Sequence, residues 1–150
     1  MRTSARKRTS RLRLLSFLAF LTYAAGVAPA VGAGDAGRGH AVFDAAGCLG
    51  CHTDKKNKGA PLAGGRALKT PFGTFFSPNI TPDMKTGIGK WSDDDFVRAL
   101  RHGVSPKGSN YFPAFPYPSY TRMTDADMLD LKAYLFSLAP VAQANTPHDM

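Results

Sequence analysis

Apolar residues recur with a helical period in three stretches of the chain, and each stretch is bracketed by residues that begin or end helices. The first helix is expected to begin at a cap by Asp35 and to end near Ala46, just before Gly47. Gly39 and Phe43 are four residues apart and therefore share one face of it. Because glycine has no side chain, we expect another helix to approach closely at that face.

A second helix is expected to begin at Ser92 and to end at Gly103. Ser92 with Asp95 makes an approximate capping box, and three consecutive aspartates, residues 93–95, lie at the positive end of the helix. These acids are explained by helix-end electrostatics better than by a metal site. The apolar face is formed by Phe96, Val97 and Leu100.

The last helix is expected to begin at Thr124, paired with Asp127, and to end at Pro140. Its apolar face is formed by Met128, Leu131, Tyr134, Leu135 and Leu138. We expect Leu131 and Tyr134 to pack against the face of the first helix. The polar residues after Pro140, 141–150, are expected to form a flexible C-terminal tail.

Between the helices the pattern is not periodic. Residues 53–90 are expected to be mostly loop, with turns where glycine and proline cluster. Residues 104–123 interleave four prolines with five aromatic residues, which excludes a helix while the aromatics still demand burial. A rigid apolar loop lying over a flat ligand fits both facts. The sequence therefore predicts an all-α fold of small helices and loops, in one domain at residues 34–140.

Residues 1–33 have the order of a secretory signal peptide: a basic start, the apolar run 14–27, and small residues up to Ala33. The apolar run is shorter than the roughly 20 residues that a transmembrane helix needs. We expect cleavage after Ala33 and an exported protein. An uncleaved N-terminal membrane anchor is the alternative.

The excess of basic residues comes from this N-terminal segment. The chain has 19 Lys and Arg against 11 Asp and Glu, but six of the basic residues lie in residues 1–13. The remainder carries 13 basic against 11 acidic residues. The high pI therefore gives no reason to expect a nucleic-acid partner. Lys55, Lys56 and Lys58 form a local basic run, which is either solvated surface or a docking patch.

The chemistry concentrates in Cys48-Leu49-Gly50-Cys51-His52, the C-x-x-C-H attachment site of a c-type haem. Two thiols at this spacing can form thioethers with the two vinyl groups of one porphyrin. His52 follows at once, so its imidazole can reach the iron. A carbonyl in the turn at residues 59–65 could fix the other nitrogen of that ring.

Three other interpretations of the two cysteines remain open. A thioredoxin-like dithiol would require a βαβ context and has no use for the adjacent histidine. Half of a zinc site would require two further ligands, yet the chain has no other cysteine and its remaining histidines are scattered. A disulfide would close a strained loop of two residues.

In these motifs the chain resembles a class I cytochrome c over about residues 35–139. More narrowly, residues 70–83, residues 86–91 and Tyr111-Phe112-Pro113-Ala114-Phe115-Pro116-Tyr117 resemble the haem domains that serve bacterial periplasmic dehydrogenases. The resemblance implies one haem c, bound through Cys48 and Cys51, with His52 as the proximal iron ligand and Pro61 presenting its carbonyl to His52. It further implies that Trp91, Tyr111 and Phe115 contact the haem.

The sixth iron ligand is where this chain departs from the family pattern. Relatives often have methionine inside the Pro-Ala-x-Pro-Tyr segment, but this chain has Phe115, which cannot bind iron. Met123 follows eight residues later, and we take it as the distal ligand. Met84 is a second candidate. Met123 could instead pack against Met128, which would leave the iron open.

The function implied is that of a periplasmic monohaem electron carrier and not of an enzyme. It would accept one electron at a time from a dehydrogenase and pass it to an oxidase or another cytochrome of the respiratory chain. Any membrane contact would be peripheral or through the uncleaved anchor. Two alternatives remain: a haem protein whose open distal site binds a small ligand or acts catalytically, and a haem-free thiol oxidoreductase.

Overall fold

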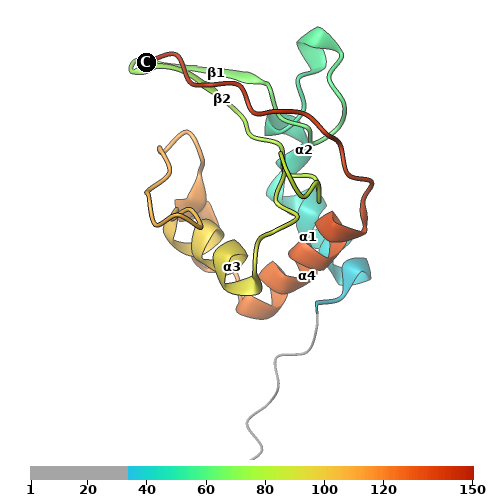
Figure 1. Ribbon diagram of the computed structural model, residues 1–150. Coiled ribbons are helices and arrows are strands. Elements are labelled where there is room, and N and C mark those ends of the chain that lie inside the picture. Colours follow the sequence, from blue (N-terminus) through green and yellow to red (C-terminus); the bar gives the residue numbers. More distant parts are fainter. Residues whose placement is uncertain (1–33) are drawn as a thin grey trace, which may run out of the picture. The chain divides into compact units, whose positions relative to one another are not determined.

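The computed structural model describes residues 34–150, so the expected signal peptide at 1–33 lies outside the described residues. No helix within residues 34–150 combines the length and the apolarity needed to cross a bilayer. Figure 1 shows the elements, which in chain order are α1 (Ala36–Ala46), α2 (Cys48–Cys51), β1 (Ala67–Thr70), β2 (Gly73–Phe76), α3 (Asp93–His102) and α4 (Asp125–Ser137), with 3₁₀ turns at Lys55–Asn57 and Tyr117–Ser119.

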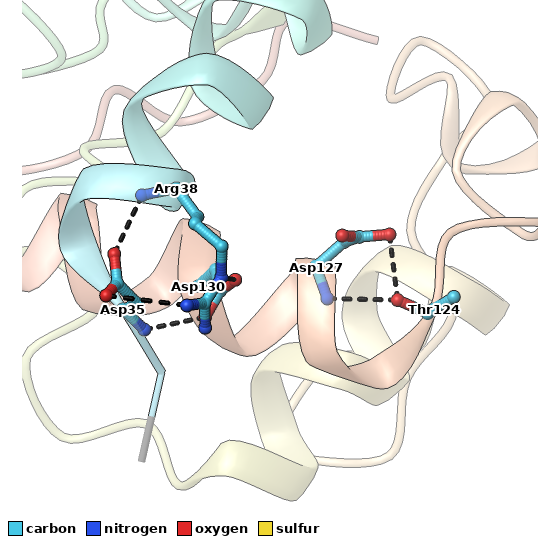
Figure 2. Close-up of polar contacts among 5 residues, drawn as sticks. All are labelled: Asp35, Arg38, Thr124, Asp127 and Asp130. Atoms are coloured by element: carbon cyan, nitrogen blue, oxygen red, sulfur yellow. Dashed lines mark hydrogen bonds and ion pairs between the residues drawn. The ribbon is translucent and has the colours of Figure 1, made fainter. Parts of the chain in front are cut away.

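The predicted starts of the three longer helices and the glycine ends of the first two are confirmed, whereas the last helix ends at Ser137 and not at Pro140. The Asp35 side chain accepts the Arg38 backbone N–H, and α1 ends at Gly47 in the left-handed conformation. Ser92 and Asp95 form a complete capping box at the start of α3, which ends at a left-handed Gly103. α4 is capped by the Thr124 side chain, which Figure 2 shows bonded to Asp127.

α1 and α4 cross at the predicted contact. A Cβ at Gly39 would collide with the Asp130 carbonyl and lie 2.9 Å from the Cβ of Tyr134, so only glycine allows this approach. The rings of Phe43 and Tyr134 lie 5.0 Å apart. The buried core that this crossing supports is formed by Phe43, Leu62, Ile88, Phe96, Leu131 and Leu135.

A buried carboxylate joins the same two helices (Figure 2). Asp130 is only 4% exposed, and its Oδ1 accepts the backbone N–H of Asp35 at 2.6 Å. Arg38 donates to both carboxylate oxygens, at 2.6 and 3.0 Å. Hydrogen bonding from Arg38, then from the Asp35 amide, lowers the pKa of Asp130. The carboxylate therefore stays charged and fixes the entry of the chain into α1.

The all-α prediction is wrong for residues 67–76. β1 and β2 form an antiparallel hairpin in which Ala67 pairs with Phe76 and Thr70 with Gly73. The strands are too short, and too interrupted by Pro71 and Gly73, for their alternation to be distinguished from loop in the sequence. The hairpin is stabilised from outside, because Phe75 is buried and stacks on Phe112 at 4.0 Å.

The C-terminal segment, residues 141–150, was expected to be a flexible tail, but hydrogen bonds hold it against the preceding chain. Thr74 and Asp149 exchange backbone hydrogen bonds at 2.6 and 3.0 Å. Val141 donates its N–H to the Thr81 hydroxyl at 3.1 Å. In Figure 1 this segment runs beside the hairpin. Polar residues here satisfy backbone groups across the fold, which composition alone does not reveal.

Candidate haem-attachment site

The C-x-x-C-H motif forms a single helical turn directly after α1. Gly47, in the left-handed conformation at φ 67°, ends α1 and precedes α2. The His52 N–H then donates to the Cys48 carbonyl at 3.0 Å, which closes the turn. Both cysteines are free, Cys48 half-buried and Cys51 exposed. One turn of the chain therefore presents both thiols and the imidazole together.

Burial affects the ionisable groups of this turn. It raises the pKa of the Cys48 thiol to about 11, so this thiol is neutral at pH 7. It lowers the pKa of His52, with the Pro78 carbonyl acting in the opposite direction. The imidazole is therefore neutral, which is the form that binds a metal.

The tautomer of His52 is fixed by a backbone carbonyl. Nδ1 lies 2.7 Å from the oxygen of Pro78, so the Nδ1–H donates to it. The lone pair is then on Nε2, which makes no hydrogen bond to any residue from 34 to 150. This is the arrangement of a proximal haem ligand.

Pro61 was expected to supply that carbonyl, and the structure gives this role to Pro78. The turn that contains Pro61 binds the backbone of the motif and not the ring, because the Gly64 N–H donates to the His52 carbonyl at 2.9 Å. Leu62 donates its N–H to the Thr53 hydroxyl at 3.1 Å. A carbonyl has no sequence signature, and Pro78 reaches the ring only because β2 leads back to it.

The loop at residues 104–123 gathers four aromatic rings. Phe115 is central, with ring centroids 5.7 Å from Tyr111, 6.3 Å from Tyr117 and 6.0 Å from Tyr120. The Tyr120 hydroxyl donates to the Ala46 carbonyl at 3.1 Å, next to the attachment turn. Burial raises the pKa of Tyr111 and of Tyr120, so both phenols remain neutral.

Met123 and Met84, the two methionines considered as distal ligands, differ in exposure. Met123 is half-buried and packs against the core, whereas Met84 is 57% exposed. The Met123 backbone is held at both ends: its N–H donates to Tyr120 at 3.0 Å, and its carbonyl accepts from Arg101 at 2.7 Å. Burial therefore favours Met123 over Met84.

Trp91 also contacts the core. It is half-buried and packs against the core, and its backbone N–H donates to the Ile88 carbonyl at 2.9 Å. This position serves core packing.

A basic cleft of about 480 Å³ opens beside the attachment turn. Gly50 of the motif forms part of its wall, and Arg66 donates a hydrogen bond to the Gly50 carbonyl. The charged side chains of the cleft are the cations Lys55, Lys56 and Arg66 and one carboxylate, Asp54. The cleft lies next to Cys51, the exposed cysteine of the pair.

Taken together, the donor atoms fit haem c. Two free thiols at vinyl spacing lie beside an imidazole whose Nε2 is free of any described hydrogen-bond partner. The described residues also include a half-buried thioether, that of Met123, and a loop of packed aromatic rings, which are groups of the kind that a haem site uses as a soft ligand and an apolar cover.

Known proteins point the same way. The family described as cytochrome c matches residues 36–139. A diheme cytochrome c-type protein of Cereibacter sphaeroides is 48% identical over 120 residues, covering 78% of this chain and 40% of that protein. The cytochrome c subunit of gluconate 2-dehydrogenase from Pantoea cypripedii is 50% identical over 114 residues, covering 75% of this chain and 25% of that subunit.

A third relative is the cytochrome subunit of fructose dehydrogenase from Gluconobacter japonicus, 42% identical over 110 residues, with 73% of this chain and 22% of that subunit covered. This chain thus spans 40% or less of the length of these relatives. The similarity is to one region of larger proteins.

Proposed function

This chain belongs to the cytochrome c family, whose domains hold covalently bound haem c, and on that premise we propose that it is a one-electron carrier. Bound haem supplies an iron that cycles between the ferric and ferrous states. The observation that carries the proposal is the neutral His52, with Nδ1–H on the Pro78 carbonyl and Nε2 free. The chain itself would perform no catalysis.

In this proposal, Cys48 and Cys51 form the two thioethers, His52 is the proximal ligand and Met123 is the distal one. A ligand on each side of the iron in both redox states keeps structural rearrangement small, which makes electron exchange fast. Trp91, Tyr111 and Phe115 line the haem, exclude water and so disfavour the extra charge of the ferric state.

The electron donor we propose is a dehydrogenase, because two relatives are named as cytochrome subunits of gluconate 2-dehydrogenase and fructose dehydrogenase. The acceptor would be an oxidase or another cytochrome of the respiratory chain. Residues 1–33 would direct export, which would place the mature chain in the periplasm with one haem. Membrane association would be peripheral, or through those residues if they are not cleaved.

Partner docking is proposed at the exposed edge of the attachment turn. Cys51 is exposed and Leu49 is 41% exposed, and the cations of the basic cleft lie beside them. A small apolar edge with a charged border suits the brief encounters of redox partners. Reversing Lys55 and Lys56 to glutamate should slow electron transfer with an acidic partner and weaken its dependence on salt.

The experiment that tests the proposal is an optical spectrum of the purified protein in both redox states. A low-spin spectrum in both states is expected, with slow binding of carbon monoxide by the reduced protein. Met123→Ala should open the distal side and give rapid binding of carbon monoxide. Met84→Ala, at an exposed methionine, is the matched control and should behave as wild type.

The packing of Met123 against the core favours one second candidate, a haem protein with an open distal site. Rapid binding of carbon monoxide by the unaltered protein, with no change on Met123→Ala, would replace the carrier by this ligand-binding function. A protein without haem would reject both.

A further inference from the structure

The peptide group that joins Pro78 to Asn79 is hydrogen-bonded at both of its ends. Its carbonyl accepts from His52 Nδ1 at 2.7 Å. Its N–H donates to the side-chain oxygen Oδ1 of Asn145, also at 2.7 Å. Because the peptide is a planar, polarisable unit, each of these bonds strengthens and orients the other. One amide therefore links the C-terminal segment directly to the imidazole.

The Asn79 side chain anchors the same junction. It is 1% exposed, and its Oδ1 accepts from the backbone N–H and the hydroxyl of Thr81, at 2.9 and 2.7 Å. Since a backbone N–H can only donate, the amide nitrogen must face the other way, toward the carbonyls of Val141 at 2.7 Å and Gln143 at 3.2 Å. The buried amide thus fixes the C-terminal segment.

Packing leaves this peptide no freedom to move aside. Gly64 lies directly under it, and a Cβ there would be 2.5 Å from the Pro78 carbonyl carbon and 2.7 Å from the Asn79 nitrogen. The peptide is therefore held by Gly64 on one face, by His52 at its carbonyl and by Asn145 at its N–H. Of these three holds, Asn145 is the one that can be changed without touching the attachment turn or the core.

We propose that Asn145 is a positioning residue for the proximal ligand: it holds the Pro78–Asn79 peptide and thereby sets the orientation and donor strength of His52. Asn145 lies beyond residues 36–139, the part that matches the family model. The inference rests on the proposed function, because it assumes that His52 binds haem iron.

The expected effect has a definite sign. A carbonyl polarised by Asn145 accepts the Nδ1 proton more strongly, which makes the imidazole a stronger donor and stabilises the ferric state. Removing the Asn145 acceptor leaves the buried Asn79 N–H without its partner, so the Pro78 carbonyl is less polarised and accepts the His52 proton more weakly. The midpoint potential should then rise, and the imidazole plane should turn.

The test is Asn145→Ala in the full-length haem-loaded protein. The midpoint potential and the haem-methyl shifts in the proton NMR spectrum of the ferric protein are measured, since those shifts depend on the imidazole orientation. We expect a higher potential and altered methyl shifts. Gln143→Ala is the matched control, because its side chain makes no hydrogen bond to residues 34–150, and it should leave both quantities unchanged.

Asn145→Asp keeps an oxygen for the Asn79 N–H but loses the Nδ2 donor to the Thr86 carbonyl at 3.4 Å, so its methyl pattern should lie closer to wild type than that of Asn145→Ala. A lower melting temperature in Asn145→Ala with unchanged potential and methyl shifts would overturn the inference and leave Asn145 a merely structural role. Failure of the proposed function would look different, because the unaltered protein would then lack covalent haem or would bind carbon monoxide rapidly.

Discussion

The two sides of the candidate haem site are held by different kinds of interaction. On the His52 side, the chain from 52 to 90 and the C-terminal segment are joined by short, buried hydrogen bonds, such as those of Asn79 and Thr81. The opposite side, the aromatic loop at 104–123, is held mainly by ring contacts around Phe115. Two hydrogen bonds connect this loop to the helices. The Tyr120 hydroxyl donates to the Ala46 carbonyl of α1, and Arg101 of α3 donates to the Met123 carbonyl.

This difference separates two tasks. Hydrogen bonds are directional, so the polar network fixes the position of one carbonyl and, through it, one imidazole. Ring packing is less directional and tolerates small displacements, so the aromatic loop can exclude water without fixing any single atom. We therefore expect changes on the His52 side to alter potential and stability, and changes in the aromatic loop to alter access to the iron.

The largest effect should come from Gly64→Ala. The new methyl group would meet the Pro78–Asn79 peptide at 2.5 Å, and φ at this residue is +79°. We expect a loss of about 3 kcal/mol in the free energy of unfolding, measured by denaturant titration. Gly108→Ala is the matched control, because its φ is +83° with nothing within 4 Å, and it should lose only about 1 kcal/mol. Equal losses would mean that the peptide is not held by packing.

Next in size is Arg101→Gln, which removes the cation that holds the Met123 carbonyl at 2.7 Å and pairs with Asp125 at 2.6 Å. We expect about 1.5 kcal/mol of stability to be lost and the ferric protein to bind added imidazole faster. Arg98→Gln is the control from the same helix, since among residues 34–150 Arg98 forms its ion pair with Asp95 alone, within α3. If both variants bound imidazole at the wild-type rate, Arg101 would have no part in closing the distal side.

A smaller effect is expected from Tyr120→Phe, which removes the hydroxyl bonded to the Ala46 carbonyl at 3.1 Å. The loss should be about 1 kcal/mol in unfolding free energy, with faster imidazole binding and an unchanged midpoint potential. Tyr117→Phe, in the same loop, changes a hydroxyl that has no hydrogen bond within residues 34–150. A change in potential for Tyr120→Phe would contradict the separation of tasks.

The last effect is a dependence of stability on pH that appears only in acid. Hydrogen bonds from Arg38 and Asp35 lower the pKa of Asp130 below its ordinary value of 3.8, so this carboxylate contributes stability above that value. The contribution is lost as the pH falls through the lowered pKa. The contribution of Asp130 to the free energy of unfolding should be constant from pH 7 to about pH 5 and then fall. Asp130→Asn should remove this part of the acid dependence.

Because α1 and α4 support both sides of the site, acid should loosen the two sides together. The melting curve and the imidazole-binding rate should therefore change over the same pH range. Separate transitions would indicate that one side is independent of the helix crossing.

The parts that could be predicted from the sequence are those fixed by neighbours in the chain. The caps at Asp35, Ser92 and Thr124 and the glycines at 47 and 103 identify the helix ends through local hydrogen bonds and local backbone geometry. The close approach at Gly39 also follows from spacing on one helix face.

The parts that were missed depend on groups far apart in the sequence. The carbonyl that meets His52 belongs to Pro78 and not to Pro61, because the hairpin carries residue 78 back to the ring. The C-terminal segment is polar and looks like a tail, but its residue Asn145 satisfies a buried N–H 66 residues away. Backbone partners of this kind leave no pattern in the sequence.

The central claim is that this chain carries haem through Cys48 and Cys51, and the most direct test is the intact mass of the denatured polypeptide. The protein should be made in cells that mature c-type cytochromes, and Cys48→Ser with Cys51→Ser serves as the control. We predict that the unaltered chain keeps the mass of one haem after denaturation and that the double variant loses it. A colourless protein with the mass of the polypeptide alone would contradict the account.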